Sequence, residues 1–262
     1  MKKQLSDIYR ILFNAYGPQG WWPIIITEQS EAIGQKNTQK DSTEVICKTG
    51  WICKYDLNAP RSENEIWEII TGAVLTQNTS WKNVEKALIN LTEFASCSSQ
   101  DSIIIKKFPT LQEISKMPLK ELEQLIKPSG FYRQKSQLLK EFARFILSFK
   151  SIEDFAKKIT REELLKQKGI GPETADSILL YACKKPAFVV DTYTKRIFSR
   201  IGLIEKSAKY DEIQKFFQDN IPKDIEIYKE YHALIVQHAK QYCQKKPICY
   251  KCPLNKKCRK LI

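Results

Sequence analysis

Four cysteines near the C-terminal end of the sequence are spaced as the ligands of one metal centre would be. Cys243, Cys249, Cys252 and Cys258 form a C-x5-C-x2-C-x5-C pattern in the segment CQKKPICYKCPLNKKC. Four thiolates this close together in the chain can surround either one zinc ion or one iron-sulfur cluster, and the spacing alone does not choose between them. Lysines and an arginine lie between and beside the cysteines. The loop should therefore be strongly positive and able to contact phosphate.

A second candidate site is the glycine turn in KGIGPETADSI, residues 168–178. A helix that ends near Lys168, a Gly169-Ile170-Gly171 turn and a new helix from Pro172 would make a helix-hairpin-helix. The glycines allow positive φ and a close backbone approach, and proline suits a first helical position. Free backbone N–H groups at the start of the second helix could then bind a DNA phosphate. An ordinary tight turn between two helices would have the same pattern, so this motif does not identify the function by itself.

The charge balance favours a polyanionic partner. The chain has 262 residues and a formal net charge of +13, which indicates either nucleic-acid binding or a solvated basic surface. No run approaches the roughly eighteen apolar residues of a membrane span, and the N-terminal segment lacks the apolar run of a signal peptide. We therefore expect a cytoplasmic protein without a membrane partner, associated with the nucleoid if the cell is prokaryotic. Clustered cysteines in that compartment are expected to bind metal rather than form disulfides.

Apolar residues recur at helical spacing along most of the chain from residue 64, so the sequence predicts an all-α fold with short connections. Only AFVVD, residues 187–191, has a strand-like pattern, and it is too short to build a sheet. Residues 24–63 are polar and irregular, which favours a mobile loop slightly over an ordered surface excursion. Cys47 and Cys53 in this segment could form a metal pair. We interpret them as unrelated cysteines, because no further ligands cluster near them.

Several longer motifs resemble the endonuclease III superfamily of helix-hairpin-helix DNA glycosylases. The motifs are ITGAVLTQNTSWKNVEKAL, PSGFYRQKSQLL, LLKQKGIGPETADSILLYACKKPAFVVDTYTKRIFSRIG, the C-terminal cysteines and GPQGWWP near the start. Within that superfamily the set is most similar to the endonuclease III-like 3-methyladenine DNA glycosylases. The resemblance implies a two-lobed all-α fold. Its expected parts are a helical lobe with the hairpin over 64–185, a cluster lobe over 1–23 and 186–262, and a polar insertion over 24–63.

The resemblance also implies an enzyme of base excision repair. Such an enzyme binds double-stranded DNA containing a damaged base and flips that base into the cleft between its lobes, here as a monomer. The cysteine motif then implies a [4Fe-4S] cluster. The chain departs from the family pattern in two places. Five residues separate Cys243 from Cys249, where the family more often has six, and the insertion over 24–63 is longer than the family pattern.

Asp191 is the expected catalytic residue. In bifunctional members of the superfamily a lysine soon after the hairpin glycines attacks the sugar, and an aspartate follows it eighteen positions later. The matching position here is Glu173, so the Schiff-base lysine is missing; Lys168 precedes the glycines and is not assigned its role. Asp191 could still stabilise an oxocarbenium-like sugar and orient or deprotonate a water. It could also cap the helix that begins at Thr192, and Glu173 could simply favour the start of its own helix.

The remaining site residues follow from the resemblance and from stacking chemistry. Aromatic rings can stack on a cationic alkylated purine such as 3-methyladenine, although the tryptophans could instead belong to the core. The expected base pocket is made by Trp21, Trp22, Trp81, Gln77 and Glu173. Gln77 is expected to enter the space that the flipped nucleotide vacates. The DNA backbone is expected at Gly169, Ile170, Gly171 and Thr174.

Other features leave alternatives open. The segment PSGFYRQKSQLL combines a turn at Gly130 with aromatic and charged residues such as Phe131 and Arg133, and it could be a wedge that faces DNA or a hydrophobic hinge. His232 and His238 lie six residues apart on a predicted helix and so do not share a face, and we interpret both as structural. Three other functions remain: a mismatch glycosylase for thymine, uracil or adenine, a bifunctional glycosylase/lyase, and a DNA-binding protein without catalysis.

Overall fold

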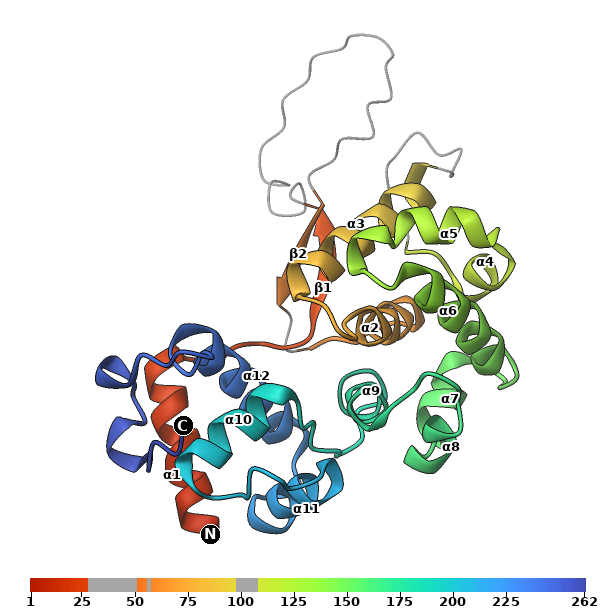
Figure 1. Ribbon diagram of the computed structural model, residues 1–262. Coiled ribbons are helices and arrows are strands. Elements are labelled where there is room, and N and C mark those ends of the chain that lie inside the picture. The colour runs from red at the N-terminus through yellow and green to blue at the C-terminus, as the bar shows by residue number, and fades with distance from the viewer. Residues whose placement is uncertain (28–50, 56–57, 98–107) are drawn as a thin grey trace, which may run out of the picture. The chain divides into compact units, whose positions relative to one another are not determined.

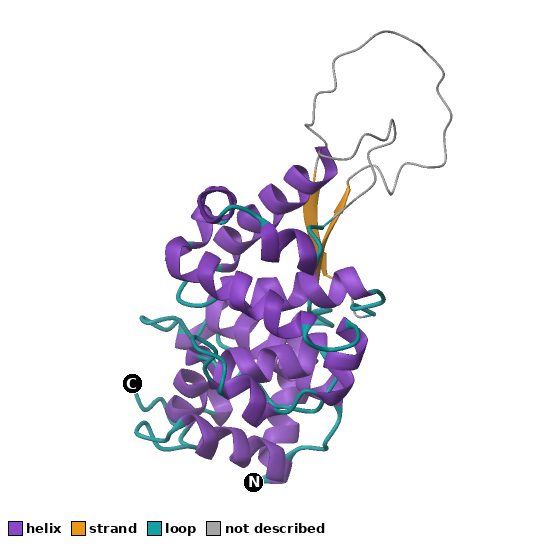
Figure 2. Cartoon of the chain, turned by 90° about the vertical axis from the view of Figure 1, so that its right-hand side faces the viewer, coloured by secondary structure: helices purple, strands orange, loops and turns teal. Residues whose placement is uncertain are grey.

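Helices dominate the computed structural model, which describes residues 1–27, 51–55, 58–97 and 108–262 (Figure 1, Figure 2). The α-helices are α1 (Lys2–Tyr16), α2 (Glu63–Leu75), α3 (Trp81–Cys97), α4 (Leu111–Lys116), α5 (Leu119–Leu125), α6 (Tyr132–Leu147), α7 (Ile152–Lys158), α8 (Arg161–Leu165), α9 (Pro172–Ser177), α10 (Thr192–Ile201), α11 (Tyr210–Asn220) and α12 (Ile225–Gln241). The shorter turns are the 3-10 helices η2 (Lys127–Ser129), η4 (Cys249–Lys251) and η5 (Asn255–Lys257), and the π-helix η3 (Ile178–Ala182). The predicted all-α class is confirmed. No helix in these ranges is both long and apolar enough to cross a membrane.

The chain forms two compact units. The terminal unit contains Met1–Trp21, Arg161–Leu165 and Ile170–Ile262, and the middle unit contains Trp22–Thr160 and Lys166–Gly169. Residues 170–185 are expected from the family resemblance in the lobe over 64–185, whereas their contacts group them with the C-terminal helices. A buried carboxylate accounts for this difference: Asp176, on α9, accepts hydrogen bonds from Arg161 at 2.8 Å and from Gln214 at 2.8 Å.

The terminal unit is built around α12, which packs against α1, α10 and η3. Its core is aromatic: the rings of Phe188 and Phe217 stack with centroids 4.2 Å apart, and Tyr228 and Tyr231 of α12 meet Phe188 edge-on. The Tyr231 hydroxyl donates to the carbonyl oxygen of Leu5, which ties α12 to α1. Burial of these large side chains fixes the C-terminal helices and the segment that leads into α10.

That segment, residues 187–190, is not a strand, so the strand-like interpretation of AFVVD is wrong. Its backbone groups bond to side chains instead of a neighbouring strand. The N–H of Phe188 donates to Gln218 at 3.1 Å, its carbonyl accepts from Gln214 at 2.9 Å, and the N–H of Val190 donates to the Tyr210 hydroxyl at 3.3 Å. The apolar run is therefore a buried connection that delivers Asp191 to the start of α10.

The middle unit contains α2 as its central helix, with every residue from Ile66 to Leu75 buried. Helices α3, α6 and α7 contact α2. A two-stranded antiparallel sheet is formed by β1 (Pro23–Thr27) and β2 (Trp51–Tyr55). Strand β1 contacts α2 and α3, and strand β2 contacts α3. The buried Glu68 carboxylate accepts a hydrogen bond from the backbone of Ile25 at 2.6 Å, so one polar group of α2 holds the first strand in place.

The two strands correct the prediction that residues 24–63 are irregular. Ile24, Ile25 and Ile26 are β-branched residues that favour a strand, but their partner lies more than twenty residues later, and local periodicity does not detect such a pairing. The mobile-loop prediction covers all of residues 24–63, and the part of it over residues 28–50 and 56–57, which includes Cys47, lies outside the described residues. Cys53 belongs to β2, but its side chain also lies outside the description, so the prediction for this pair remains a prediction.

Candidate active site

The predicted hairpin forms between α8 and α9. Gly169 has φ +85°, and a Cβ placed there would lie 3.2 Å from a methyl group of Leu138, so both the conformation and the packing favour glycine. Gly171 differs from expectation: it has an extended φ of −91° and stands at the N-cap of α9, with Pro172 as the first helical residue. Ile170 is buried, as expected of a residue that anchors the turn.

Thr174, in the first turn of α9, is 7% exposed. A phosphate at this helix start would meet the backbone rather than the Thr174 side chain. The expected phosphate contact at the hairpin therefore remains a prediction that concerns backbone N–H groups.

Asp191 is the N-cap of α10, and one of its two oxygens is used for that purpose. Oδ1 accepts hydrogen bonds from the backbone N–H of Thr194 at 2.6 Å and from the Thr194 hydroxyl at 2.8 Å. Asp191 thus has the helix-capping role that was expected as an alternative to catalysis, and the cap holds its carboxylate in a fixed orientation. Oδ2 has no part in the cap and lies 3.7 Å from Nε2 of His232.

Next to Asp191 lies a hydrogen-bonded pair of buried side chains, a histidine and a tyrosine. His232 of α12 is 5% exposed, and its Nδ1 is 2.7 Å from the hydroxyl of the fully buried Tyr181. Tyr181 lies in η3, the π-helical turn that continues α9; turns of this kind occur often at functional sites. The ring of Trp21 meets the imidazole edge-on, with centroids 5.5 Å apart. The structural interpretation of His232 was therefore incomplete, because this side chain faces the catalytic candidate.

The two carboxylates of this site have opposite pKa shifts. Desolvation, reinforced by the negative charge of Asp191, raises the pKa of Glu173 to about 7, although the side chain remains accessible to solvent. Burial acts to raise the pKa of Asp191 as well, but His232 and the two donors from Thr194 outweigh it, and the net shift is downward. In many active sites two neighbouring carboxyl groups have different pKa values, so that one is protonated and the other is ionised at the same pH.

The adjacent tryptophans do not form one stack. Trp22 is 5% exposed and belongs to the middle unit, where its ring meets Trp81 at an interplanar angle of 90°. A Cβ at Gly72 would lie 3.1 Å from the Trp22 ring, so this glycine of α2 makes room for the indole. Trp22 is thus a core residue with Trp81 at its edge, whereas Trp21 joins Tyr181 and His232.

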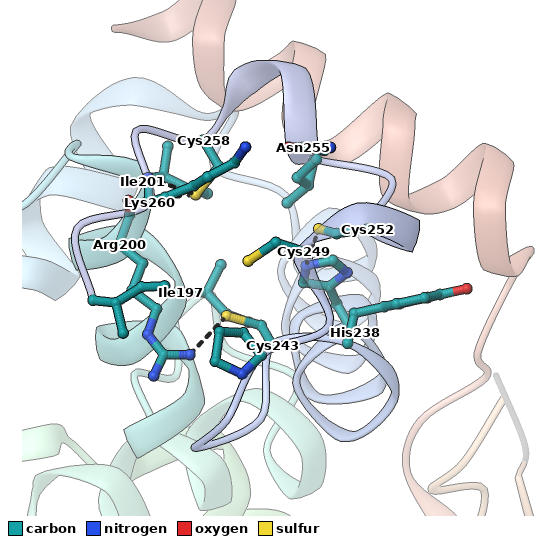
Figure 3. Close-up of a pocket in the computed structure, with 14 residues that line it drawn as sticks. Ile197, Arg200, Ile201, His238, Cys243, Cys249, Cys252, Asn255, Cys258 and Lys260 are labelled. Carbon is teal, nitrogen blue, oxygen red and sulfur yellow. Dashed lines mark hydrogen bonds between the residues drawn. The ribbon is translucent and has the colours of Figure 1, made fainter.

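The four cysteines line one hollow in the terminal unit. Cys243 follows α12, Cys249 begins η4, and Cys252 and Cys258 follow η4 and η5; their sulfur atoms face a common space (Figure 3). Burial, together with the charges of the neighbouring thiols, raises the pKa of Cys252 and of Cys258.

Hydrogen-bond donors also point at the sulfur atoms. Nη1 of Arg200 lies 3.4 Å from the sulfur of Cys243, and the backbone N–H of Lys260 donates to the sulfur of Cys258 at 3.3 Å. The same guanidinium donates to the carbonyl oxygens of Gln244 and Lys245, which fixes the loop beside the thiols. This donor set suits sulfur atoms that carry negative charge as metal ligands.

In the described ranges no group of three or more Cys, His, Asp or Glu side chains converges closely enough to hold a metal ion. Four cysteine thiolates that line one hollow are suitable ligands for a zinc ion or for an iron-sulfur cluster.

A family model described as HhH-GPD superfamily base excision DNA repair protein matches residues 71–223. The chain belongs to this superfamily. A protein of Methanocaldococcus jannaschii, named as a candidate DNA repair glycosylase, is 42% identical over 264 residues, which cover 98% of this chain and 96% of the relative. The protein is accordingly a DNA glycosylase of the HhH-GPD superfamily.

Two solved structures show the same fold. The crystal structure of the H. pylori 3-methyladenine DNA glycosylase bound to 1,N6-ethenoadenine has 36% sequence identity and a TM-score of 0.56, covering 69% of this chain and 89% of that chain. A non-covalent complex of endonuclease III with DNA has 21% identity and a TM-score of 0.67, covering 99% of this chain and 96% of that chain. The likeness to endonuclease III supports the helix-hairpin-helix glycosylase fold.

The glycosylase also has an open groove in its middle unit, with a volume of about 860 Å³. Gln77 lies at this groove, and its side-chain amide donates to the carbonyl oxygen of Gly169 at 3.0 Å. Phe131 and Arg133, at the start of α6, lie on it as well, and Phe131 is 62% exposed in a left-handed conformation with φ +45°. An exposed ring argues for the wedge interpretation of this turn, because a hydrophobic hinge would be buried.

Lys135 holds two edges of this groove together. Its Nζ is buried and donates to the carbonyl oxygens of Leu75 and Ser129, both at 2.8 Å. Leu75 ends the helix before Gln77, and Ser129 precedes the turn of Phe131. Desolvation lowers the pKa of Lys135 to about 8. The sequence contained this lysine in the PSGFYRQK motif, but nothing in the motif indicated that it would be buried.

Proposed function

We propose that this protein is a monofunctional DNA N-glycosylase of base excision repair that acts as a monomer on duplex DNA. It hydrolyses the N-glycosidic bond of a flipped, damaged base, and the preferred base is an alkylated purine such as 3-methyladenine. The observation that carries the proposal is the setting of Asp191, which is fixed by the cap of α10 on one oxygen and faces the interior of the site with the other.

The monofunctional assignment rests on the residue at position 173. A lyase needs an amine that can attack the sugar, and this chain has Glu173 where bifunctional relatives have that lysine. In the described part of the chain the side chain that lies beside Oδ2 of Asp191, at 3.7 Å, is His232 and not a lysine. Hydrolysis by an activated water is the chemistry that these groups support.

The substrate assignment rests on the charge of the site. Alkylation at a purine ring nitrogen gives the base a positive charge, and Asp191, Glu173 and the electron-rich ring of Trp21 all favour a cation nearby. The H. pylori relative, a 3-methyladenine DNA glycosylase, supports the same class of base.

The four cysteines would hold a [4Fe-4S] cluster. The four cysteines that line one hollow and the donors from Arg200 and Lys260 fit such a group. When bound, the cluster would cross-link residues 243–258, a stretch with only two short 3-10 turns of its own. The lysine-rich loop would then be rigid enough to contact DNA phosphates.

The DNA would be held at the hairpin and at the groove of the middle unit. Gly169, Ile170, Gly171 and the backbone at Thr174 would meet a phosphate. Gln77 and Phe131 would enter the base stack, because both lie on the same groove and Phe131 has no core to fill.

Base release from methylated duplex DNA tests the proposal. The wild type should release free 3-methyladenine, detected by chromatography, and Asp191→Asn should bind the DNA but release none. Borohydride should not trap the wild type on DNA. Release of thymine, uracil or adenine from mispairs in preference to alkylpurines would favour a mismatch glycosylase, and binding without release of any base would favour a non-catalytic protein.

A further inference from the structure

The site contains a buried polar atom that the established superfamily membership does not explain. Nε2 of His232 has no hydrogen-bond partner among the described residues, although the side chain is 93% buried, with a relative accessibility of 7%. A buried nitrogen without a partner is costly, and in a native protein it often marks a water or a ligand that completes the site. The atom is not free to turn away, because Nδ1 on the other side of the ring is bonded to Tyr181.

The neighbours of His232 aim Nε2 at the catalytic carboxylate. The Tyr181 hydroxyl lies 2.7 Å from Nδ1 on one edge of the imidazole, and the Trp21 ring packs against the imidazole at an interplanar angle of 88°. On the other edge Nε2 lies 3.7 Å from Oδ2 of Asp191, which is slightly too long for a direct hydrogen bond. Two polar atoms at this separation can both bond to one water at the apex of a triangle, with each bond about 2.8 Å long.

We propose that His232 and Asp191 together bind the water that attacks the sugar, which makes His232 a further catalytic residue of this glycosylase. This inference rests on the proposed function, since only a monofunctional enzyme needs such a water. The geometry explains why the histidine is buried beside the carboxylate and why its outer nitrogen has no protein partner. It also gives the two oxygens of Asp191 separate roles: Oδ1 caps α10, and Oδ2 binds the water and takes its proton.

The reaction that the two residues would perform is a hydrolysis with a simple balance. The bond between C1′ and the base nitrogen breaks, and its electron pair leaves with the base, so a cationic alkylpurine departs as a neutral molecule. The water oxygen forms the new bond to C1′. Its proton passes to Oδ2 of Asp191 and then to solvent, while Nε2 of His232 holds the water in line by donating to it or accepting from it.

Two substitutions at position 232 separate the roles of the two ring nitrogens. Asparagine can keep a polar atom near the place of Nδ1 and thus the partner of Tyr181, but it has nothing at the place of Nε2. Glutamine is longer and can return a polar atom to the place of Nε2. Tyr228→Phe is a matched control, because it removes a second buried polar atom of α12 that has no hydrogen-bond partner among the described residues and lies outside the site.

Single-turnover release of 3-methyladenine by the full-length, metal-loaded protein gives the first measurement. His232→Asn should slow release about 100-fold, within the usual range for a positioned acid-base group. His232→Gln should recover at least about ten-fold of that loss, and Tyr228→Phe should match the wild type. A rate for His232→Asn equal to that of the wild type would overturn the proposal.

The nucleophile itself gives a second measurement that loss of folding does not alter. With methanol as cosolvent, the wild type should form mostly the hydrolysed sugar, because the bound water attacks first. In the residual reaction of His232→Asn the fraction of methyl glycoside should rise. An unchanged fraction, with both variants equally slow, would make His232 merely structural. Covalent trapping of the wild type by borohydride would instead overturn the proposed monofunctional activity together with this inference, because an amine would then be the nucleophile.

Discussion

Trp21 and Trp22 are adjacent in the sequence, but their rings pack in different units of the chain. The Trp21 ring contacts His232 and Tyr181 in the terminal unit, and the Trp22 ring contacts Trp81 in the middle unit. The unit boundary falls between them, so one residue borders the candidate catalytic group while the next is core. Their substitutions should therefore have different consequences.

Trp22→Ala should lower the free energy of unfolding by about 3–5 kcal/mol, the usual cost of removing a buried tryptophan. Trp21→Ala should change it much less, because Trp21 is only half-buried, while slowing base release by about ten-fold or more. Chemical denaturation and single-turnover excision measure the two effects. A Trp21→Ala variant that unfolds at a much lower denaturant concentration than the wild type but excises the base at the normal rate would contradict these separate roles.

Asp191 serves as helix cap and as catalytic group, and two substitutions separate these roles. Asn is as good an N-cap as Asp, so Asp191→Asn should keep the Thr194 hydrogen bonds and the stability of the protein while abolishing excision. Asp191→Ala should lose excision and also about 1 kcal/mol of stability. Equal stability of the two variants would show that the cap contributes nothing measurable.

The sequence predicts those parts of the site that are local in the chain. The Gly169 turn and the cap at Asp191 each depend on residues within about one helical turn of each other, and each is present in the structure. The four cysteines lie between residues 243 and 258 and line one hollow. The helices could also be predicted, since burial of one face imposes a period that the sequence must carry.

Long-range pairings could not be predicted in this way. The strand partner of β1 lies beyond a long segment, and the backbone of residues 187–190 is satisfied by side chains of α11. The role of His232 could not be predicted either, because the spacing of two histidines on a helix does not show which residues each one contacts. Only the fold brings Tyr181, from a π-helical turn, and Asp191 to the same imidazole.

The raised pKa of Glu173 predicts how stability changes with pH. The folded value of about 7 lies above the unfolded value of about 4.3, so between these values the folded protein holds a proton that the unfolded chain has lost. The free energy of unfolding should therefore fall as pH rises from about 4.3 to 7. Glu173→Gln should remove this part of the dependence, as measured by denaturation across the range.

The same ionisation should have the opposite effect on the reaction. Above pH 7 the Glu173 carboxylate is charged and favours a cationic base, so kcat/KM for methylated DNA should rise through that pH in the wild type. Glu173→Gln should flatten the rise. A neutral lesion is the control substrate, and an identical pH profile for cationic and neutral bases in the wild type would rule out this role for Glu173.

The cysteine centre predicts a defined metal content. The purified protein should contain about four iron and four sulfide per chain with visible absorption, and Cys249→Ser should lose them. Removal of the cluster should loosen the C-terminal loop and weaken DNA binding more at low salt than at high salt, because its lysines contact phosphate. Cys183→Ser is the control, since burial raises the pKa of that thiol to about 12 and it lies outside the hollow. One zinc per chain without sulfide would contradict the cluster.

The exposed ring of Phe131 predicts a role in opening the DNA. Phe131→Ala removes a side chain that is 62% exposed, so the free energy of unfolding should stay within about 0.5 kcal/mol of the wild type. Excision from a fully paired duplex should slow about ten-fold, because the ring would otherwise fill space in the base stack and offset the cost of flipping. Excision of the same lesion from an unpaired bubble should change less, since unstacking costs less there. Leu119→Ala, at another exposed apolar residue of the middle unit, should leave both rates unchanged. Equal losses on duplex and bubble would show that Phe131 contributes to binding in general and not to flipping.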